Sequence, residues 1–363
     1  MRIFQNFGLY PAYFDRLREL NKGQSTFNGL LKTFLDDRFG ATHFLQPVLS
    51  QSSTAFFTNG DDERLQRQWA SENNLRTGVS LEDILLAQIE HHGTEVFYNV
   101  DPMRYGSGFV RRLPSCVKKS VAWRAAPSPG ADFGAYDAIL CNFPSILQTY
   151  RELGWRAEYF SPAHDPEMDA YAANRERPID VLFVGGYSRH HRRRAVVLEA
   201  VATLQGSLEI VLCLDRSRLT RLAESPIGRL LPLAAHRRPG NIRAVSRKPV
   251  FGRELYAIVS QAKIVLNGAV DMAGSDRGNM RCFEAMGCGA LMVSDQGRYP
   301  EGMQNEKTML LYEGSDGAMR TVKRALAEWD VSREIALNGQ RLMRESYSKA
   351  KQWTDFVDLV EKL

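Results

Sequence analysis

The sequence predicts an α/β protein made of two Rossmann-like domains that face a central cleft. Short apolar runs of strand length alternate with segments of helical period along the chain, which is the pattern of parallel sheets connected through helices. A polar stretch interrupts this alternation once, and the alternation then begins afresh. The length of 363 residues also suits two domains better than one.

The first domain is predicted to cover residues 1–165. It opens with RIF as a strand, and later apolar runs indicate further strands that alternate with helices. The polar region from about Ser50 to Ser80 indicates no definite element. The predicted strands are Glu95–Asp101, Lys118–Arg124, Ala135–Asn142 and Arg156–Ser161, and the predicted helices are Leu81–Gly93 and Pro144–Gly154.

A linker is predicted over residues 166–178, followed by the second domain over residues 179–345. Ligands of open α/β sheets bind at the carboxyl ends of the strands, so polar residues at those ends are candidates for a site. The predicted strands are Ile179–Gly186, Leu208–Leu214, Lys263–Asn267 and Ala290–Asp295, and the predicted helices are Arg193–Leu204, Glu254–Ala262 and Met280–Gly289.

The composition is that of a globular protein, with 44% apolar and 25% charged residues. The net charge of +5 mildly favours anionic ligands, and is too small to indicate a nucleic-acid partner. The first residues contain no signal-peptide region, and no apolar run is long enough to span a membrane. The chain is therefore expected in the cytoplasm. Its five scattered cysteines fit core thiols better than a zinc site: Cys116, Cys141, Cys213, Cys282 and Cys288.

The strand VLFV ends in two glycines that precede a basic helix start. Gly185 and Gly186 allow a ligand to approach the backbone, and the helix start offers free N–H groups to a phosphate. His191, Arg192 and Arg193 add donors and positive charge. The alternative is that this charge run is a solvated helix face. The segment has neither GxGxxG nor GxxxxGK[ST], which disfavours an ordinary dinucleotide site or P-loop.

A second candidate anion site lies in the stretch DRGNMRCFEAMGCGALMVSD, from Asp276 to Asp295. The backbone N–H groups of Asn279 and Met280 are predicted to point outward at a helix start. Arg281 can neutralise a phosphate, and Glu284, one turn further on, can accept hydrogen bonds from a ribose diol. The alternative is that Asp276 is a helix cap and Glu284 a surface residue.

This stretch resembles the Glu-x7-Glu donor-binding motif of retaining GT-B glycosyltransferases of family 4. The sequence from about Ile179 to Tyr347 is similar to the C-terminal domains of the glycosyl transferases group 1, in which segments like VLFVGGYSRHHRRRAVVLEAV and ELYAIVSQAKIVLN come in the same order. The segment YDAILCNFPSILQTYRELGWRAEYFSPAHDP is similar to the domain junction of that group. The resemblance implies the GT-B fold, with a nucleotide-sugar donor on the second domain and an acceptor on the first.

The resemblance also implies roles for individual residues. Glu284 is expected to hold the ribose, and Arg192 or a neighbour, with the backbone at Asn279–Met280, the diphosphate. Asp276 stands where the family has its first Glu, which contacts the donor sugar, and Asn267 matches a position near the donor. The last stretch, residues 346–363, is similar to the tail that crosses back onto the first domain.

The acceptor side is predicted less definitely. Asp101 ends a predicted strand and is the first candidate for a base that takes the acceptor proton, although such a residue can also simply form a turn. Asp15 is a second candidate, and a retaining enzyme can dispense with a protein base. His164, at the predicted domain junction, could meet the donor, the alternative being a plain linker residue. A possible amphipathic basic patch near the start suggests peripheral membrane contact, the alternative being an ordinary packed helix: Tyr10, Tyr13, Phe14, Arg16 and Arg18.

The expected function is glycosyl transfer from a nucleotide-diphosphate sugar to a glycan or lipid-linked acceptor, in the synthesis of a bacterial surface polysaccharide or glycoconjugate. Arginines and helix starts can stabilise the leaving diphosphate without a metal, and the sequence has no Asp-x-Asp motif, so no cofactor or metal is expected. The alternatives are a sugar-nucleotide epimerase of the same fold and a sugar-nucleotide-binding or scaffold protein without catalysis.

Overall fold

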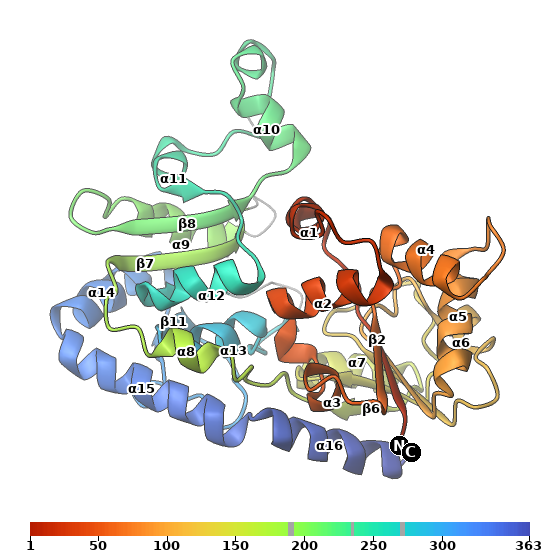
Figure 1. Cartoon of the computed structure of the whole chain (residues 1–363). Coiled ribbons are helices and arrows are strands. Elements are labelled where there is room, and N and C mark those ends of the chain that lie inside the picture. The colour runs from red at the N-terminus through yellow and green to blue at the C-terminus, as the bar shows by residue number, and fades with distance from the viewer. Residues whose placement is uncertain (188–191, 234–235, 269–272) are drawn as a thin grey trace. The chain divides into compact units, whose positions relative to one another are not determined.

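The computed structural model describes residues 1–187, 192–233, 236–268 and 273–363. The chain forms two compact units, each built on its own parallel sheet (Figure 1). Unit 1 contains Met1–Ala163, residues 273–276 and Tyr347–Leu363. Unit 2 contains the rest of the chain between His164 and Ser346. The predicted architecture of two α/β domains with parallel sheets is confirmed.

The sheet of unit 1 has six parallel strands in the order β2-β1-β3-β4-β5-β6. Nearly all of their residues are buried, which is typical of a parallel sheet with both faces covered. In the register, Asn6 lies opposite both Thr58 and Asn99, so three strands end side by side. The strands are β1 Ile3–Asn6, β2 Ala55–Thr58, β3 Val96–Asn99, β4 Lys119–Trp123, β5 Ala138–Cys141 and β6 Ala157–Tyr159.

Capping side chains set the start of several helices in unit 1. Thr26, Asp62 and Ser80 each accept hydrogen bonds from backbone N–H groups of the helical turn that follows. The region of residues 50–80, which the sequence left unassigned, contains β2 and a helix. The helices are η1 Pro11–Tyr13, α1 Phe14–Leu20, α2 Phe27–Asp37, η2 Ala41–His43, α3 Gln46–Leu49, α4 Glu63–Glu72, α5 Leu81–His92, α6 Ser107–Val110, α7 Pro144–Glu152 and α16 Lys349–Glu361.

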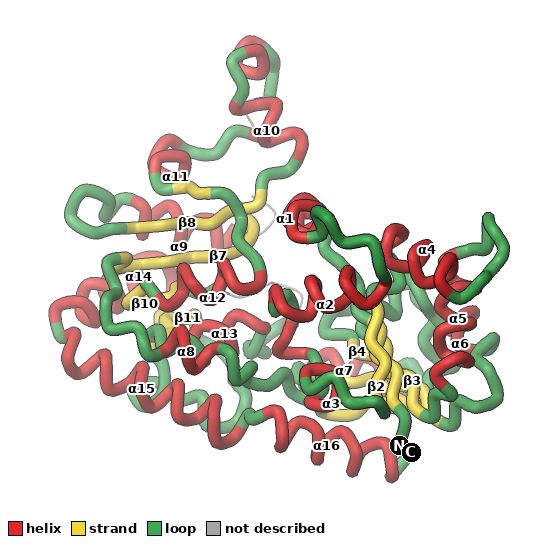
Figure 2. Tube along the Cα trace, viewed as in Figure 1, coloured by secondary structure: helices red, strands yellow, loops and turns green. Residues whose placement is uncertain are grey.

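The sheet of unit 2 also has six parallel strands, in the order β12-β11-β10-β7-β8-β9. The central strands β11, β10 and β7 are neighbours, and Figure 2 shows β7 and β8 running side by side. The strands are β7 Ile179–Gly186, β8 Ile210–Asp215, β9 Ser246–Arg247, β10 Ala262–Leu266, β11 Leu291–Asp295 and β12 Leu310–Tyr312.

The helices of unit 2 include one inside the segment for which the sequence predicts a linker. Met168 of this helix, α8, is fully buried, and Arg177 donates hydrogen bonds to the carbonyls of Val259, Ala262 and Cys288. These contacts fasten the polar segment to unit 2. The helices are α8 Met168–Ala172, α9 Arg192–Ala202, α10 Arg218–Glu224, η3 Ile227–Leu230, α11 Gly240–Ala244, α12 Gly252–Ser260, α13 Met280–Gly287, α14 Gly314–Ala327 and α15 Trp329–Ser346.

Each unit has its own apolar core. Phe4 of β1, Phe97 of β3 and Ile139 of β5 belong to the core of unit 1, where the ring of Phe4 also stacks on that of Phe56 at 4.9 Å. The core of unit 2 includes buried residues of all its longer strands: Val181, Leu212, Ile264 and Leu291. Among the helices of the described chain, none is both long enough and apolar enough to cross a membrane.

Candidate functional site

Three central strands of unit 2 end beside one another and bring polar groups together. Gly186 ends β7, Asn267 directly follows β10, and Asp295 ends β11. Because β11, β10 and β7 are parallel neighbours, these residues share the carboxyl edge of the sheet. This is the edge at which open α/β sheets bind ligands.

Helix α13 begins after Asn267 and before β11, with its N-terminus open. Gly278 has a φ of 113°, which favours glycine over any residue with a Cβ. Asn279 is the N-cap residue, but its side chain makes no capping hydrogen bond. The N–H of Cys282 donates to the Asn279 carbonyl at 3.0 Å, whereas those of Met280 and Arg281, at the positive end of the helix dipole, are available to an anion.

The amides of Asn267 and Asn279 join this helix start to the strand ends. The Nδ2 of Asn267 donates to the Oδ1 of Asn279 at 3.4 Å and to the Oγ of Ser294 at 3.2 Å. The Nδ2 of Asn279 lies 3.3 Å from the Oδ1 of Asn267, and the Tyr312 hydroxyl donates to the Asn267 carbonyl at 2.7 Å. Asn267 therefore holds the N-terminus of α13 against β10 and β11, as its predicted place near the site requires.

The pair of Arg281 and Glu284 lies in the first turns of α13. The Nη1 of Arg281 is 2.8 Å from the Oε2 of Glu284, and the two side chains are 17% and 8% exposed. Burial raises the pKa of the Glu284 carboxyl, and the nearby Arg281 opposes that rise. The Nε of Arg281 is buried and has no hydrogen-bond acceptor among the described residues. Such a buried donor is costly without a partner, so a ligand acceptor at this point is physically favoured.

The glycine pair and the basic helix start are only partly as predicted. A Cβ on Gly185 would lie 3.1 Å from the ring of Phe183, whereas Gly186 is exposed with open space around it. Gly186 is thus the glycine that leaves room for a close approach to the backbone. His191 lies outside the described residues. Arg192 begins α9, but its side chain is not among those described, and Arg193 is exposed.

Arg194 is the described arginine of α9 that reaches the strand ends, and the sequence analysis missed it. Its Nη2 donates to the carbonyl of Gly268 at 3.0 Å, and its guanidinium lies 5.9 Å from the ring centroid of Phe183. Gly268 directly follows Asn267, so Arg194 belongs to the same edge of the sheet. Arg194 is one of three consecutive arginines. Which of the three side chains reaches the strand ends depends on how helix α9 is rotated, and the sequence does not show this.

Asp276 has a structural partner that the sequence did not predict. Its side chain is 2% exposed, and its Oδ2 accepts a hydrogen bond from the backbone N–H of Ser145 at 2.6 Å. Ser145 is the second residue of α7, so the carboxylate caps that helix within unit 1. The Ser145 hydroxyl donates to the carbonyl of Ala273 at 3.1 Å and fastens the same segment. The catalytic role of Asp276 stays a prediction.

Arg277, which the sequence analysis did not single out, forms a half-buried ion pair at the end of β11. Its Nη2 and Nε lie 2.8 and 3.0 Å from the Oδ2 of Asp295. The Tyr299 hydroxyl donates to the Asp295 carbonyl at 2.6 Å. This ion pair connects the loop before α13 to β11, the strand that follows α13, and so helps to hold the start of the helix in place.

The carboxyl edge of the sheet in unit 1 holds a second group of polar residues. Asn6 donates from its Nδ2 to the Oδ1 of Asn99 at 2.8 Å, and the same oxygen of Asn99 accepts the backbone N–H of Asp101 at 2.9 Å. The Asp101 carboxylate lies 3.5 Å from the Nε of Arg104 and is 20% exposed. A Cβ on Gly8 would lie 2.8 Å from this carboxyl group, so the chain passes close to it.

Asp61 is a second carboxylate of this edge, and the sequence analysis missed it. Its Oδ2 accepts the backbone N–H of Leu9 at 2.9 Å, and its Oδ1 is buried without a hydrogen-bond donor among the described residues. Burial raises the pKa of Asp61 to about 6; the Leu9 N–H opposes the rise, and the negative charge of Asp101 adds to it. Asp61 follows the four-residue strand β2, too short for a clear sequence pattern.

Two further candidate residues have structural partners. Asp15 is exposed and pairs with Arg18 at 3.4 Å. The Nε2 of His164 is 3.0 Å from the Oδ1 of Asp169, and the ring is buried in unit 2. In the part of the chain that the structure describes, no group of three or more His, Cys, Asp or Glu side chains could hold a metal ion.

The amphipathic patch suggested near the N-terminus is not a continuous exposed surface. Tyr13 is fully buried, with its hydroxyl donating to Asp37 at 2.9 Å. Arg16 forms an ion pair with the same carboxylate at 2.5 Å, with 17% of its side chain exposed. Only Tyr10 and Arg18 of the five residues are largely exposed, since Phe14 is half-buried. The prediction of a basic amphipathic face there is wrong, because the ring and guanidinium face Asp37.

One surface depression of the described structure lies away from both groups. It has a volume of about 580 Å³ and is lined by Gln205–Ile210 and Ala244–Arg247. These residues surround the amino end of β8, opposite to the edge that holds Gly186 and Asn267. The depression carries none of the predicted site residues and has no part in the site.

Comparisons with known proteins support the fold. Residues 216–358 match a family model described as glycosyl transferase-like. HepE of Anabaena, solved with UDP and glucose, is 12% identical with a TM-score of 0.56, and the match covers 100% of both chains. Sucrose-phosphate synthase of Thermosynechococcus elongatus is 12% identical with a TM-score of 0.52, covering 100% of this chain and 99% of that one.

An α-glucosyltransferase solved with UDP-glucose and DNA containing an abasic site is 10% identical. The match covers 99% of this chain and 98% of that one, with a TM-score of 0.59. No protein of curated function matches the sequence. The chain has the fold of the GT-B glycosyltransferases, as expected, and its residues 216–358 match the glycosyl transferase-like family.

Proposed function

We propose that this chain transfers a glycosyl group from a nucleoside-diphosphate sugar to a glycan or lipid-linked acceptor. The observation that carries the proposal is the buried Nε of Arg281, which has no acceptor among the described residues. It lies at the open N-terminus of α13, beside the buried carboxylate of Glu284. A diphosphate supplies the missing acceptor, and a ribose diol supplies donors to the carboxylate.

The proposed chemistry follows from these charges. When the glycosidic bond to the donor breaks, negative charge accumulates on the departing diphosphate. Arg281 and the N–H groups at Asn279 and Met280 face that charge without needing to reorganise, which is the usual source of electrostatic catalysis. Glu284 orients the ribose, and Asn267 holds the helix start in place. The other proposed donor-binding residues are Gly185, Gly186, His191, Arg192 and Arg193, and no metal is required.

The acceptor is proposed to bind at the carboxyl edge of the sheet in unit 1. Asp101, with 20% of its side chain exposed, is the proposed base for the acceptor hydroxyl, and burial raises the pKa of its carboxyl. Asp61 beside it has one carboxylate oxygen buried without a hydrogen-bond donor among the described residues. The proposed process is the synthesis of a bacterial surface polysaccharide or glycoconjugate in the cytoplasm, and the five free cysteines suit a reducing compartment.

A uridine nucleotide is the first donor to test. HepE was solved with UDP-glucose and the α-glucosyltransferase with UDP-glucose, and both share this fold. The base of the donor is set by the shape of the pocket, so the other nucleotides belong in the same experiment.

The proposal is tested by thermal unfolding of the full chain with UDP, GDP, ADP, CMP and TDP, each also as a sugar conjugate. A ligand at 100 times its Kd adds about 2.7 kcal/mol to the free energy of unfolding. We expect one nucleoside diphosphate to raise the unfolding temperature clearly. No shift with any of them would contradict the donor site. Interconversion of free nucleotide sugars without an acceptor would instead identify an epimerase.

The role of Glu284 is tested by Glu284→Gln, which keeps the shape of the side chain but removes its charge. We expect nucleotide affinity to fall about tenfold or more, since a charge-assisted hydrogen bond contributes about 1.5–3 kcal/mol. The matched control is Glu306→Gln, in an exposed pair with Arg324 at 2.9 Å in the same unit. Isothermal titration calorimetry gives both affinities, and an unchanged affinity in Glu284→Gln would remove this residue from ribose binding.

A further inference from the structure

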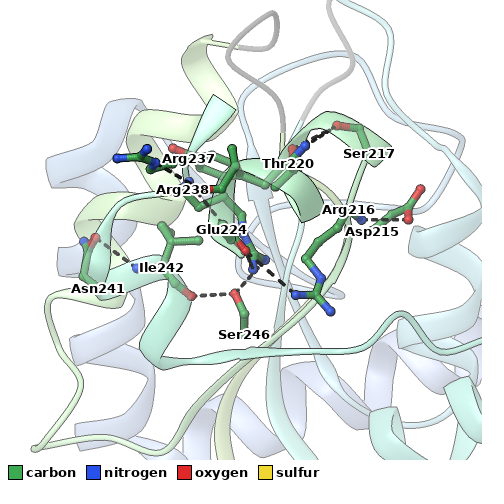
Figure 3. A network of polar contacts seen from close by, with 12 residues as sticks. Asp215, Arg216, Ser217, Thr220, Glu224, Arg237, Arg238, Asn241, Ile242 and Ser246 are labelled. Carbon is green, nitrogen blue, oxygen red and sulfur yellow. Dashed lines mark hydrogen bonds and ion pairs between the residues drawn. The ribbon is translucent and has the colours of Figure 1, made fainter. Parts of the chain in front are cut away.

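The connection between β8 and β9 leaves the sheet and forms a small structure of its own. It contains α10, η3 and α11, and we call residues 216–245 the β8–β9 excursion. Glu224 and Arg238 hold it together through hydrogen bonds of 2.7 and 2.8 Å, with 9% and 7% of their side chains exposed (Figure 3). The Nη1 of Arg238 also donates to the Oγ of Ser246 at 3.2 Å and so ties this pair to β9.

A second arginine fixes the turn after α10. The side chain of Arg237 donates to the carbonyls of Ala223 at 3.0 Å and Gly228 at 2.8 Å. Ala223 is fully buried, so one side of α10 faces these contacts. The excursion is therefore an ordered element with a packed inner side. The fold determines which of its side chains are exposed on the outer side.

The outer side of the excursion is apolar. Leu219 and Leu222, three residues apart on α10, are 49% and 45% exposed. Ile227 and Leu230 of η3 are 71% and 88% exposed, and Leu231 is 42% exposed. These five are among the fourteen large apolar side chains that the described residues expose, and they fall within 13 consecutive positions. Such a concentration marks an interaction surface.

The same segment carries the positive charge of the protein. Residues 216–245 contain seven arginines and one acidic residue, and the remainder of the chain has 40 basic and 41 acidic residues. The net charge of +5 is thus concentrated here. Arg216, Arg218 and Arg221 are exposed, and the latter two have no ion pair with another described residue. Arginines beside exposed leucines are complementary to a surface that is apolar inside and anionic outside.

We propose that the β8–β9 excursion binds the surface of an anionic lipid bilayer. Leu222, Ile227 and Leu230 would enter the boundary between headgroups and acyl chains, and Arg218 and Arg221 would contact lipid phosphates. A lipid surface fits better than nucleic acid, because residues 216–245 contain no Trp, Tyr or Phe on which bases could stack. The proposal concerns a surface distinct from the donor site and does not depend on it.

The test is co-sedimentation of the full chain with vesicles, either of phosphatidylcholine alone or with equal parts of phosphatidylglycerol. We expect binding to the anionic vesicles that weakens as salt is raised. Arg218→Gln with Arg221→Gln should weaken it about fivefold per arginine. Leu222→Ser with Ile227→Ser and Leu230→Ser should weaken it roughly tenfold or more, since apolar insertion is lost.

The matched control is Tyr10→Ser with Arg18→Gln, which alters the exposed apolar and basic residues of the N-terminal segment instead. It should bind vesicles as the unmodified chain does, and thermal unfolding should show that all variants are folded. Absence of binding to anionic vesicles would overturn the proposal. Binding of the triple serine variant as tight as that of the unmodified chain would also overturn it, as would a loss of vesicle binding seen in the control variant alone. Tighter binding to a DNA duplex than to vesicles would indicate a nucleic-acid surface instead. A dimer in sedimentation that the serine substitutions abolish would indicate an interface between two copies of the chain.

Discussion

Buried charges in the two units are balanced in different ways. Glu284 has Arg281 at 2.8 Å, so its charge is compensated on its own helix. The Oδ2 of Asp61 accepts the backbone N–H of Leu9, and the negative charge of Asp101 disfavours its ionisation. Burial favours the protonated form of this carboxyl more strongly than the Leu9 N–H and the nearby Arg104 oppose it, which is why the pKa of Asp61 rises to about 6.

This rise predicts how stability depends on pH. Since the pKa of Asp61 is about 6 in the folded chain and 3.8 in the unfolded one, the folded chain binds the proton more tightly. The stabilisation is complete below about pH 4 and is lost as the pH rises through 6, by up to about 3 kcal/mol. Asp61→Asn should remove this dependence. Chemical denaturation across this pH range, compared between the two proteins, measures it.

Asp101→Asn gives a second check of the same interaction. Removing the neighbouring negative charge should lower the pKa of Asp61, so the loss of stability should begin at a lower pH. Carboxyl carbon shifts in NMR spectra would follow the titration of Asp61 directly. Asp15→Asn, at an exposed position paired only with Arg18, should leave the midpoint unchanged. An Asp61 midpoint near 4 in the unmodified chain would contradict the account.

At the scale of elements, the segment that leads into α13 also caps a different helix, α7. Asp276 precedes α13 by four positions in the chain, but its carboxylate caps α7, because the N–H of Ser145 lies 2.6 Å away. The chain spacing alone suggested a cap or a ligand contact on α13. A helix distant in sequence provided the partner, and no local pattern encodes such a contact.

Asp276→Ala should therefore destabilise the chain by about 1–2 kcal/mol through loss of the cap on α7. The free energy of unfolding in urea measures this loss. Ser145→Ala is the matched variant: it keeps the backbone N–H and removes only the hydroxyl bond to Ala273, so its effect should be smaller. Wild-type stability of Asp276→Ala with abolished glycosyl transfer would instead favour the catalytic role implied by the family.

The elements that sequence patterns predicted well are those with long periodic runs. Strands such as Ile179–Gly186 and helices such as Leu81–His92 are continuous in apolar period and have clear ends, including the cap at Ser80. The four-residue strand β2 has no readable period, so Asp61 behind it was missed. Arg194 was missed for another reason. Three consecutive arginines look alike in the sequence and differ only in the side of the helix on which each lies.

At the scale of the whole molecule, the C-terminal helix α16 belongs to unit 1, although Arg277–Ser346, which directly precede the last segment of that unit, belong to unit 2. Both chain termini thus lie in one unit. Lys349, 5% exposed, donates from its Nζ to the carbonyls of Thr42 at 3.1 Å and Phe44 at 2.7 Å and to the Oε1 of Gln352 at 3.1 Å. The resemblance to a family implied such a tail, but the lysine that anchors it has no sequence signal.

This buried lysine also controls a neighbouring ring. Burial lowers the pKa of His43 to about 3, and the positive charge of Lys349 adds to that effect. The ring is therefore neutral near pH 7, so the lysine is the charged partner of the two. Its ammonium group donates to two backbone carbonyls and an amide oxygen, which makes the position intolerant of any side chain that cannot donate to them.

Lys349→Met keeps the length of the side chain and removes the donors, leaving the carbonyls of Thr42 and Phe44 without this partner. We expect unit 1 to lose about 2–4 kcal/mol of stability, the usual cost of several unsatisfied buried groups. Hydrogen exchange should then accelerate in α16, η2 and β1 but not in β7, β10 or α13. Because the donor residues lie in unit 2, nucleotide affinity should stay unchanged. Faster exchange throughout both units would show instead that the two unfold together and that α16 stabilises the whole chain.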